Sequence, residues 1–492
     1  MAGDVPGPLA LLRTAPATGD AGTAPGVLDF YRALIGTALA AVHRWRLPIV
    51  VELALVALYF LLRTANADDA VMGAWLVAAV VLAVASPARG LVILAAIAPF
   101  NEAFLVSRDV GSKSILALAL LAAVGCRWLL SPAARARPSA PVILAGLLLA
   151  GSGLGLVRTR LRWGADFTEL AAQIWLQGVA TMLVVFVVAV WTARRGELRP
   201  LAAALAATTV AGILSLADYW GDAALRESLL GWAVVGPFNP SRLTGVIRSP
   251  TSTAALVMLP ATVYLTAAVL GRGRLLRLGA ALLATPLLVA AYLTYNRAVF
   301  IALWLLAVVA GWRIRRWLGV LILVVGLTGG ALLVPWYISV RGQALGGGAQ
   351  PPPGEVLIAS DQMRLTAWGA ATRMFLDEPL LGQGYRAYRQ LAVEFGDPTL
   401  NAPHNEWLRF FAEQGAIVGV TGLAFAAVTL LRLARRRGWL ETGMLASFLS
   451  FCLAACFNNP FLFNQVTIPA FILAGTGVAL AGIPERSDAP DG

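Results

Sequence analysis

Long apolar blocks recur along most of this sequence. About 14 blocks of on the order of 15–20 residues can be delimited, and a helix of about 20 apolar residues crosses the roughly 30 Å hydrocarbon core of a bilayer. Hydrophobic residues make up 59% of the 492 residues and charged residues only 13%, which is too apolar for a water-soluble protein. The sequence therefore predicts an all-α polytopic membrane protein with about 12–14 transmembrane helices and excludes water-soluble enzyme folds. The candidate spans lie near 47–63, 71–86, 90–106, 114–130, 141–157, 173–192, 200–217, 251–270, 275–295, 298–312, 317–336, 416–432, 440–457 and 461–481.

Arginine marks one side of the predicted membrane. Because cytoplasmic loops are enriched in basic residues, a cluster at every second junction predicts the cytoplasmic side and places both termini there. The clusters are Arg44 and Arg46, Arg89, Arg135 and Arg137, Arg194 and Arg195, Arg272 to Arg277, Arg313 to Arg316, and Arg432 to Arg437. Three further arginines, Arg158, Arg160 and Arg162, fall on the opposite side and depart from the pattern.

The spans and loops divide the chain into segments of different character. We predict a disordered cytoplasmic tail at 1–43, a transmembrane bundle at 44–336 with an outer loop at 218–250, a large outer loop at 337–415, C-terminal transmembrane helices at 416–482 and a cytoplasmic tail at 483–492. The two outer loops are too long to be simple connections. Function is therefore expected on the outer side.

The larger outer loop changes character along its length. Residues 341–355 are rich in Gly and Pro and predict no regular structure. A helix is predicted over 361–377, because residues recur there at helical spacing: Met363, Ala367, Ala370 and Met374. A further helical piece follows the turn at 382–384, and another begins near 403 and runs directly into the span at 416. We predict a helical cap on the membrane face; the alternative is a solvated connecting loop.

Only two histidines occur in the chain. His43 lies in the basic flank of the first predicted span, where a structural role is expected. His404 lies on the outer side, where a loop helix enters the membrane, beside Asn405 and Glu406. Its ordinary pKa near 6.5 suits a general base that takes a proton from a hydroxyl. A cap or a hydrogen-bond anchor is the structural alternative for a histidine at this place.

Four arginines lie on the same outer side as this histidine. Arg297 occupies a tight turn between two apolar spans, where a charge indicates a functional site unless its side chain snorkels to the interface. Arg242 and Arg248 precede the span at 251, and Arg364 opens the cap helix. Guanidinium groups bind phosphate oxygens bidentately, so these arginines predict a clamp that neutralises a diphosphate leaving group.

The sequence argues against several other kinds of site. No basic stripe indicates nucleic acid as a partner, and the three cysteines all fall in apolar blocks. Neither a DxD pair nor an HExxH pattern occurs, so no metal or other cofactor is expected.

Three motifs follow one another on the outer side. The first is Tyr295-Asn296-Arg297 in its turn, and the second is Arg364 with a Trp-containing helix and the DEPLLGQG segment at 377–384. The third is His404-Asn405 before a span, followed by Leu408, Glu413, Gly415 and Gly419. In this order the motifs resemble the superfamily of O-antigen ligases and O-antigen polymerases of the bacterial envelope, over roughly residues 240–420.

The chain departs from that superfamily's pattern in two places. Asn296 stands where the superfamily usually has Ser before the arginine. A fainter upstream match runs from Arg242 to Gly245 and includes Pro250, where Thr251 replaces the usual Asn.

The resemblance implies a glycosyltransferase-C-like fold and an enzyme of the bacterial inner membrane with a periplasmic active site. The donor would be an undecaprenyl-diphosphate-linked glycan, and His404 would deprotonate the acceptor hydroxyl for an inverting, metal-independent displacement. The diphosphate would be held by Arg297, Arg364 and either Arg242 or Arg248. Asn405 would orient the histidine or the acceptor, and Glu413 would support the site without touching substrate.

Several acceptors and two other protein classes remain open. Lipid A core, the acceptor of a ligase, is favoured over the growing glycan of a polymerase and over a protein hydroxyl. A polytopic transporter or flippase and a non-catalytic subunit of a polysaccharide export system are the alternatives to an enzyme. Membrane lipids are expected partners, and export-pathway proteins are candidates.

Overall fold

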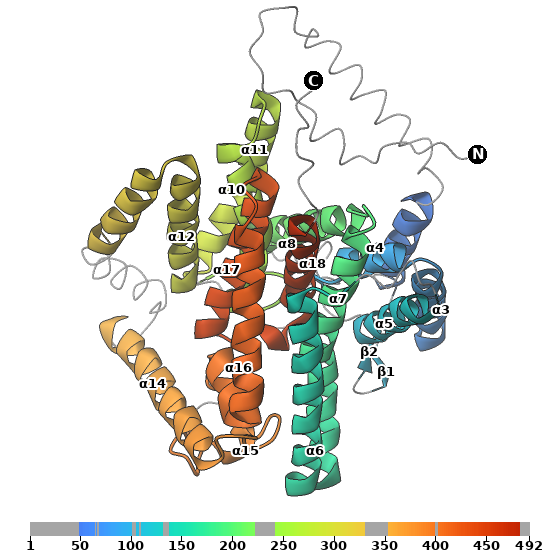
Figure 1. The fold of residues 1–492 in the computed structure, drawn as a ribbon, viewed down its shortest axis with the longest axis vertical. Helices are drawn as coiled ribbons and strands as arrows, with labels where there is room; N and C mark the ends of the chain where they lie inside the picture. The colour runs from blue at the N-terminus through green and yellow to red at the C-terminus, as the bar shows by residue number, and fades with distance from the viewer. Residues whose placement is uncertain are drawn as a thin grey trace, which may run out of the picture.

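The computed structural model describes residues 49–63, 65, 68–100, 105–107, 110–130, 137–221, 242–329, 353–398 and 402–482. The predicted tails at 1–43 and 483–492 lie outside these described residues, as does most of the predicted loop at 218–250. The described chain is helical apart from a small antiparallel pair, β1 (Leu105–Ser107) and β2 (Val110–Gly111) (Figure 1). The predicted all-α polytopic membrane fold is confirmed.

Within the described residues, nine helical runs are long and apolar enough to cross a membrane. They are α5 (Ser112–Leu130), the run Ala140–Ala193, α8 (Arg199–Trp220), α10 (Pro250–Leu270), α11 (Arg274–Leu293), α12 (Arg297–Ile314), α16 (Glu406–Ala434), α17 (Trp439–Phe457) and α18 (Asn464–Ala481). Shorter apolar helices are α3 (Asp69–Ala85), α4 (Pro87–Ile97) and Arg316–Gly329, and residues 49–63 form another helix.

The span predicted at 90–106 is not formed. The 11 residues of α4 would extend only about 16 Å, roughly half of the hydrocarbon thickness. After Ile97 the chain leaves the helix and reaches β1. Residues 98–100 and the strand at 105–107 do not continue the helix, and residues 101–104 lie outside the described part of the chain.

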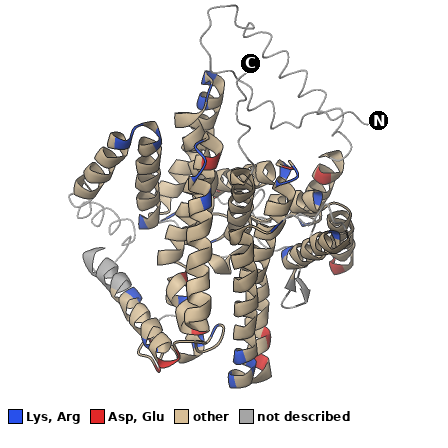
Figure 2. Cartoon of the chain, viewed as in Figure 1, with Lys and Arg blue, Asp and Glu red and all other residues tan. Residues whose placement is uncertain are grey.

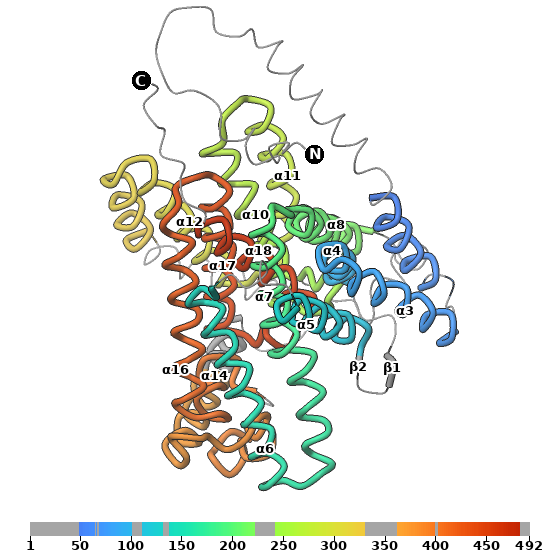
Figure 3. Tube along the Cα trace, turned by 45° about the vertical axis from the view of Figure 1, so that its right-hand side comes forward, coloured from blue at the N-terminus to red at the C-terminus, as the bar shows by residue number. Residues whose placement is uncertain are grey.

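The run from Ala140 to Ala193 is a helical hairpin. It contains α6 (Ala140–Trp175), the π-helical turn η2 (Leu176–Ala180) and α7 (Thr181–Ala193). The chain reverses within α6 at Gly164, whose φ of 81° favours glycine, and Trp175 Nε1 donates to Ser152 Oγ across the hairpin at 2.9 Å. Figure 3 shows the two arms side by side, as predicted for the spans at 141–157 and 173–192. At 1.5 Å per residue the first arm is about 36 Å long, so it extends beyond a bilayer core.

The basic junctions gather at one end of the bundle. Figure 2 shows Lys and Arg at the α10–α11 connection and at the end of α12, far from the helices of the large outer loop. Arg313 Nη2 donates to Ala434 O at 2.7 Å, which brings two of the predicted arginine junctions together. These junctions therefore lie at the end of the bundle opposite the large outer loop, and further arginines, among them Arg158, lie beside that loop.

The C-terminal helix α18 forms the centre of the bundle, and most of its side chains are buried. A Cβ on Gly475 would lie 2.6 Å from Phe186 O of α7, so α7 and α18 approach too closely for a larger residue. Small residues allow this close packing of helices in a membrane.

Candidate functional site

The described part of the large outer loop, which we call the cap, is helical over much of its length. Its main helix, α14 (Pro353–Asp377), covers the predicted helix at 361–377. Three of the four residues predicted at helical spacing, Ala367, Ala370 and Met374, are fully buried, whereas Met363 is 39% exposed. The helix starts earlier than predicted, inside the Gly/Pro-rich stretch, because proline is tolerated in the first turn of a helix.

The turn after α14 forms hydrogen bonds with the end of a short helix, residues 406–414. Gln383 N donates to Ala412 O at 3.1 Å and Gly384 N donates to Glu413 O at 2.8 Å, which satisfies carbonyls at the end of the helix 406–414. Gly382 has a φ of 68°, and a Cβ there would overlap the backbone nitrogens of Gln414 and Gly415. Glycine is required at this point of contact.

The chain reverses direction at Gly415, inside α16. Gly415 has a φ of 74° and a non-helical ψ of −176°. A Cβ on Gly419 would lie 2.7 Å from the ring of Phe411, so the residues before and after the reversal lie side by side. The prediction that the helix beginning near 403 runs directly into the span at 416 is therefore wrong. The short helix 406–414 folds back against the span 416–434.

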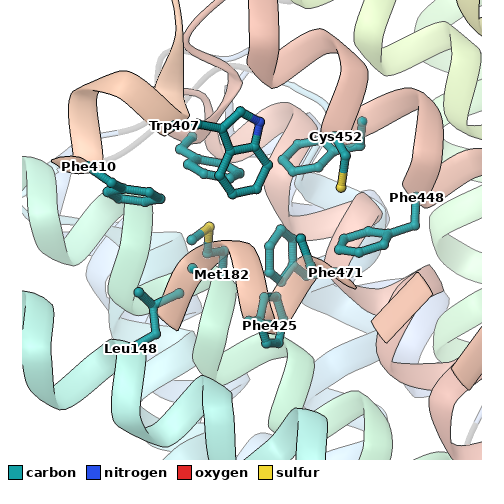
Figure 4. A pocket seen from close by; sticks show the side chains of 12 residues that line it. Leu148, Met182, Trp407, Phe410, Phe425, Phe448, Cys452 and Phe471 are labelled. Atoms are coloured by element: carbon teal, nitrogen blue, oxygen red, sulfur yellow. The ribbon is translucent and has the colours of Figure 1, made fainter. Parts of the chain in front are cut away.

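This reversal places the start of the short helix next to the α17–α18 turn. Glu406 Oε1 accepts a hydrogen bond from Phe461 N at 3.2 Å, and Glu406 forms a buried ion pair with Arg409 at 2.6 Å. Trp407 and Phe410 pack into an aromatic cluster with Phe461 and residues of α16, α17 and α18 (Figure 4). The enclosed space there is only about 10 Å³, so the cluster is packed rather than open to a ligand.

The helical hairpin at Gly164 supports the cap from the other side. Arg158 Nη2 lies 2.9 Å from Glu378 Oε2, and Arg162 donates to Gln383 Oε1. Thr159 Oγ1 also donates to Tyr385 O at 3.2 Å. Two of the three arginines that departed from the predicted charge pattern therefore bind the cap.

One cavity brings together five of the predicted site residues. It has a volume of about 620 Å³ and lies between the bundle and α14. Its lining includes Arg242, Arg248, Arg297, Arg364 and His404. These residues are as much as 162 positions apart in the sequence, and the fold places all of them around one space.

The cavity lies at the N-terminal ends of helices. Its lining includes the first turns of α10 and α12, and His404 lies two residues before α16 begins. Each start has a side-chain cap: Ser249 Oγ accepts from Ser252 N, Asn296 Oδ1 from Ala298 N and Asn405 Oδ1 from Leu408 N. Unpaired N–H groups and the helix dipole give such ends a positive potential, which favours anions together with the arginines.

Unusual backbone conformations concentrate around the same space. Four described residues other than glycine have a positive φ, and three of them line the cavity: Arg248 at 55°, Tyr295 at 50° and His404 at 50°. Such conformations cost on the order of 1–3 kcal/mol each and are common at functional sites, where the surrounding structure holds them.

The turn that carries Arg248 is held by α8, in a way that the sequence analysis missed. Arg248 Nη1 lies 3.0 Å from Asp218 Oδ2, and the Asp218 side chain is only 2% exposed. In the same turn, Val246 N donates to Ser215 Oγ at 3.2 Å. Asp218 is a single acidic residue at the outer end of an apolar span, and such residues usually have a specific partner.

His404 is half-buried, and its environment favours the neutral imidazole. Burial lowers the pKa of His404 below its ordinary value of 6.5, the nearby positive charge of Arg364 lowers it further, and Asp397 acts in the opposite direction. The residue is therefore neutral at pH 7 and able to accept a proton. Asp397 is buried and accepts a hydrogen bond from the Tyr388 hydroxyl at 2.7 Å.

Two other predicted residues have different surroundings. The Asn405 side chain caps the helix 406–414, so it fixes the backbone next to His404. Glu413 lies at the opposite end of that helix, where Oε1 accepts from Tyr388 N at 3.3 Å. Glu413 therefore joins the helix 406–414 to Tyr388, which lies earlier in the cap. Neither Asn405 nor Glu413 is in the cavity lining.

Trp368 lines the cavity, and the sequence predicted no role for it. It lies one turn after Arg364 in α14, lines the cavity, and donates from Nε1 to Pro403 O at 2.9 Å. Among the described residues, no group of three His, Cys, Asp or Glu side chains could hold a metal ion.

Comparison with known proteins places this cavity in a family context. Residues 278–421 match the family model described as O-antigen ligase, and this segment contains Arg297, Arg364, Trp368 and His404. No curated protein sequence matches the chain. The family match supports glycosyl transfer by a membrane protein, and it supports a relationship of residues 278–421 to the O-antigen ligase superfamily.

Proposed function

We propose that this chain transfers a glycan from an undecaprenyl-diphosphate-linked donor to an acceptor hydroxyl at the periplasmic face of the bacterial inner membrane. The observation that carries the proposal is the cavity itself, where four arginines, helix N-termini and a neutral histidine surround one space. Both termini of the chain would then lie in the cytoplasm.

The donor diphosphate is held by charge and by hydrogen bonds. Arg297 and Arg364 approach the cavity from α12 and α14, and Arg242 and Arg248 approach it from the turn before α10. Guanidinium groups and helix N-termini both stabilise phosphate oxygens, and they retain that ability as negative charge builds on the leaving group. The lipid tail lies toward Ile301 and Leu365, apolar lining residues that are 36% and 63% exposed.

The transfer is a single displacement. An imidazole nitrogen of His404 takes the proton of the acceptor hydroxyl, whose oxygen forms a bond to the anomeric carbon of the donor. The bond between that carbon and the diphosphate oxygen breaks, and undecaprenyl diphosphate leaves with the electron pair. The anomeric centre is inverted. Arg242, Arg248, Arg297 and Arg364 stabilise the departing charge without a metal ion, and Asn405 positions His404 by capping the next helix.

We favour lipid A core as the acceptor, which makes the protein an O-antigen ligase. A polymerase of the same superfamily, which would use the growing glycan on another lipid carrier, is the second candidate. A protein hydroxyl as acceptor is the third, and a transporter or flippase is the alternative outside the enzymes.

Reconstitution in lipid vesicles tests the proposal. The purified protein is given an undecaprenyl-diphosphate-linked glycan with and without lipid A core, and products are separated by size on a gel. A shift that requires lipid A core supports the ligase, whereas a ladder from donor alone identifies a polymerase. Arg297→Gln should lower the yield of product, and Arg160→Gln is its matched control, because Arg160 is exposed near the Gly164 reversal and is absent from the cavity lining.

No product in either lane from folded protein, with several donors tried, would contradict both of these enzymes. Transfer to a protein acceptor or transport would then be tested next. Activity that survives His404→Ala would remove the histidine base from the mechanism.

A further inference from the structure

Trp368 lines the cavity and lies close to residues with two different proposed roles. It lies four residues after Arg364, so the two side chains project from the same face of α14. Its Nε1 donates to Pro403 O at 2.9 Å, and Pro403 directly precedes His404. Trp368 therefore shares a helix face with an arginine proposed to bind the diphosphate. It is also hydrogen-bonded to the residue before the histidine proposed as the base.

The hydrogen bond to Pro403 determines what Trp368 can offer to a ligand. The indole has one polar group, its N–H, and that group is already used by a backbone carbonyl. Since Trp368 also lines the cavity, the part that remains for a ligand is the aromatic ring. An aromatic face is apolar and carries a partial negative charge, so it attracts the slightly positive C–H groups on the face of a sugar ring.

The chemistry of the donor indicates where its first sugar lies relative to Trp368. This sugar is bonded directly to the diphosphate, and its anomeric carbon is attacked by the oxygen that His404 deprotonates. It must therefore lie between the arginines and His404. We propose that Trp368 is a binding residue for the first sugar of the donor, a pyranose that stacks on the indole face. This inference rests on the proposed function, because it assumes that the diphosphate and His404 take the roles given above.

The polar residues around the cavity fit a sugar ring as well. Asn458, Thr251 and Asn296 contribute to the lining along with the arginines. Asn296 Oδ1 is occupied by the cap of α12, whereas its amide N–H₂ group remains a possible donor to a hydroxyl. If one face of the sugar stacks on Trp368, the hydroxyl groups at the edge of the sugar ring can form hydrogen bonds with these polar lining residues.

A comparison of two lipids tests the proposal. The dissociation constants of undecaprenyl diphosphate and of an undecaprenyl-diphosphate-linked monosaccharide are measured for each variant in nanodiscs, and the ratio of the two constants isolates the contribution of the sugar. Trp368→Leu should shift this ratio by roughly five- to tenfold against the sugar-bearing lipid, in the upper part of the range for an aromatic contact. Binding of undecaprenyl diphosphate itself should change little.

Two further variants separate ring stacking from structure. Trp368→Phe keeps an aromatic face but removes the N–H, so the ratio should stay within about twofold of the wild-type value. Trp304→Leu is the matched control, because Trp304 is also partly buried and donates from Nε1 to a backbone carbonyl, Ile322 O at 3.0 Å, but is absent from the cavity lining. It should leave the ratio unchanged.

The outcomes also separate this inference from the proposed function. If Trp368→Leu weakens both lipids equally, or neither of them, the sugar does not stack on Trp368, although the proposed function stands. If Trp368→Phe loses as much as Trp368→Leu, the hydrogen bond to Pro403 matters rather than the ring face, and the inference is again overturned. If the wild-type protein binds neither lipid, the proposed function fails, and this inference fails with it.

Discussion

The ion pair between Asp218 and Arg248 gives a quantitative prediction for the cavity. Asp218→Asn keeps the size of the side chain but removes the negative charge 3.0 Å from the guanidinium. The two side chains are only 2% and 13% exposed, so loss of one partner should cost about 3 kcal/mol of the free energy of unfolding, the lower end for a buried pair. Arg248→Gln should cost a similar amount.

A double-mutant cycle measures the coupling between the two residues. The variant with both substitutions should lose about 4 kcal/mol, rather than the about 6 kcal/mol that independent effects would give. The free energy of unfolding can be followed by titrating the protein with SDS in mixed micelles. The pair Glu52 and Arg199 is a matched control for a buried ion pair, with a separation of 2.8 Å and side chains 5% and 23% exposed.

The affinity for the donor distinguishes the Asp218–Arg248 pair from the control pair Glu52–Arg199. Only the Asp218 and Arg248 variants should weaken binding of undecaprenyl diphosphate, by about tenfold, because Arg248 would bind a phosphate oxygen while Asp218 holds it in place. Additive stability losses would refute the coupling. Unchanged donor affinity in Arg248→Gln would refute the role of this arginine in the diphosphate clamp.

Three other perturbations test the histidine and the cap. His404→Ala should lower the transfer rate by about 10²–10⁴-fold without unfolding the protein. In the wild-type protein, kcat/KM should fall with decreasing pH only below 6.5, because burial and Arg364 lower the pKa of His404. In Arg364→Gln that acidic limb should move to higher pH, because a charge that disfavours the imidazolium is removed; a limb that stays in place would contradict the electrostatic account. Gly382→Ala should reduce both thermal stability and transfer, since its Cβ would overlap the backbone at Gln414, whereas Gly73→Ala, which has open space around it, should do neither.

The sequence alone predicted five of the residues that line the cavity. Charged and titratable residues are energetically costly in an apolar protein and usually have a functional role there, which is why the sequence could point to His404, Arg297 and Arg364. Motif order and the predicted sidedness then put them on the same face of the membrane. Their convergence on one cavity follows from the packing of α10, α12, α14 and α16, which no local pattern specifies.

The features that were missed depend on the tertiary structure. Gly415 is one glycine in an apolar helical segment, and its sequence context did not distinguish a reversal of the chain from a continuous helix. The hydrogen bond from Tyr388 N to Glu413 Oε1 likewise joins residues 25 positions apart, which the sequence does not bring together. Asp218 directly follows the span predicted at 200–217, and its partner Arg248 lies 30 residues further along the chain, so no local pattern connects the two.

The central claim is that the cavity at the helix N-termini holds the donor diphosphate next to His404. A cryo-EM map of the His404→Ala variant with an undecaprenyl-diphosphate-linked glycan tests this most directly, because the variant should bind the donor without consuming it. The account predicts density for the two phosphates between Arg297 and Arg364, with the first sugar against Trp368. Diphosphate density elsewhere on the protein, with this cavity empty, would contradict it.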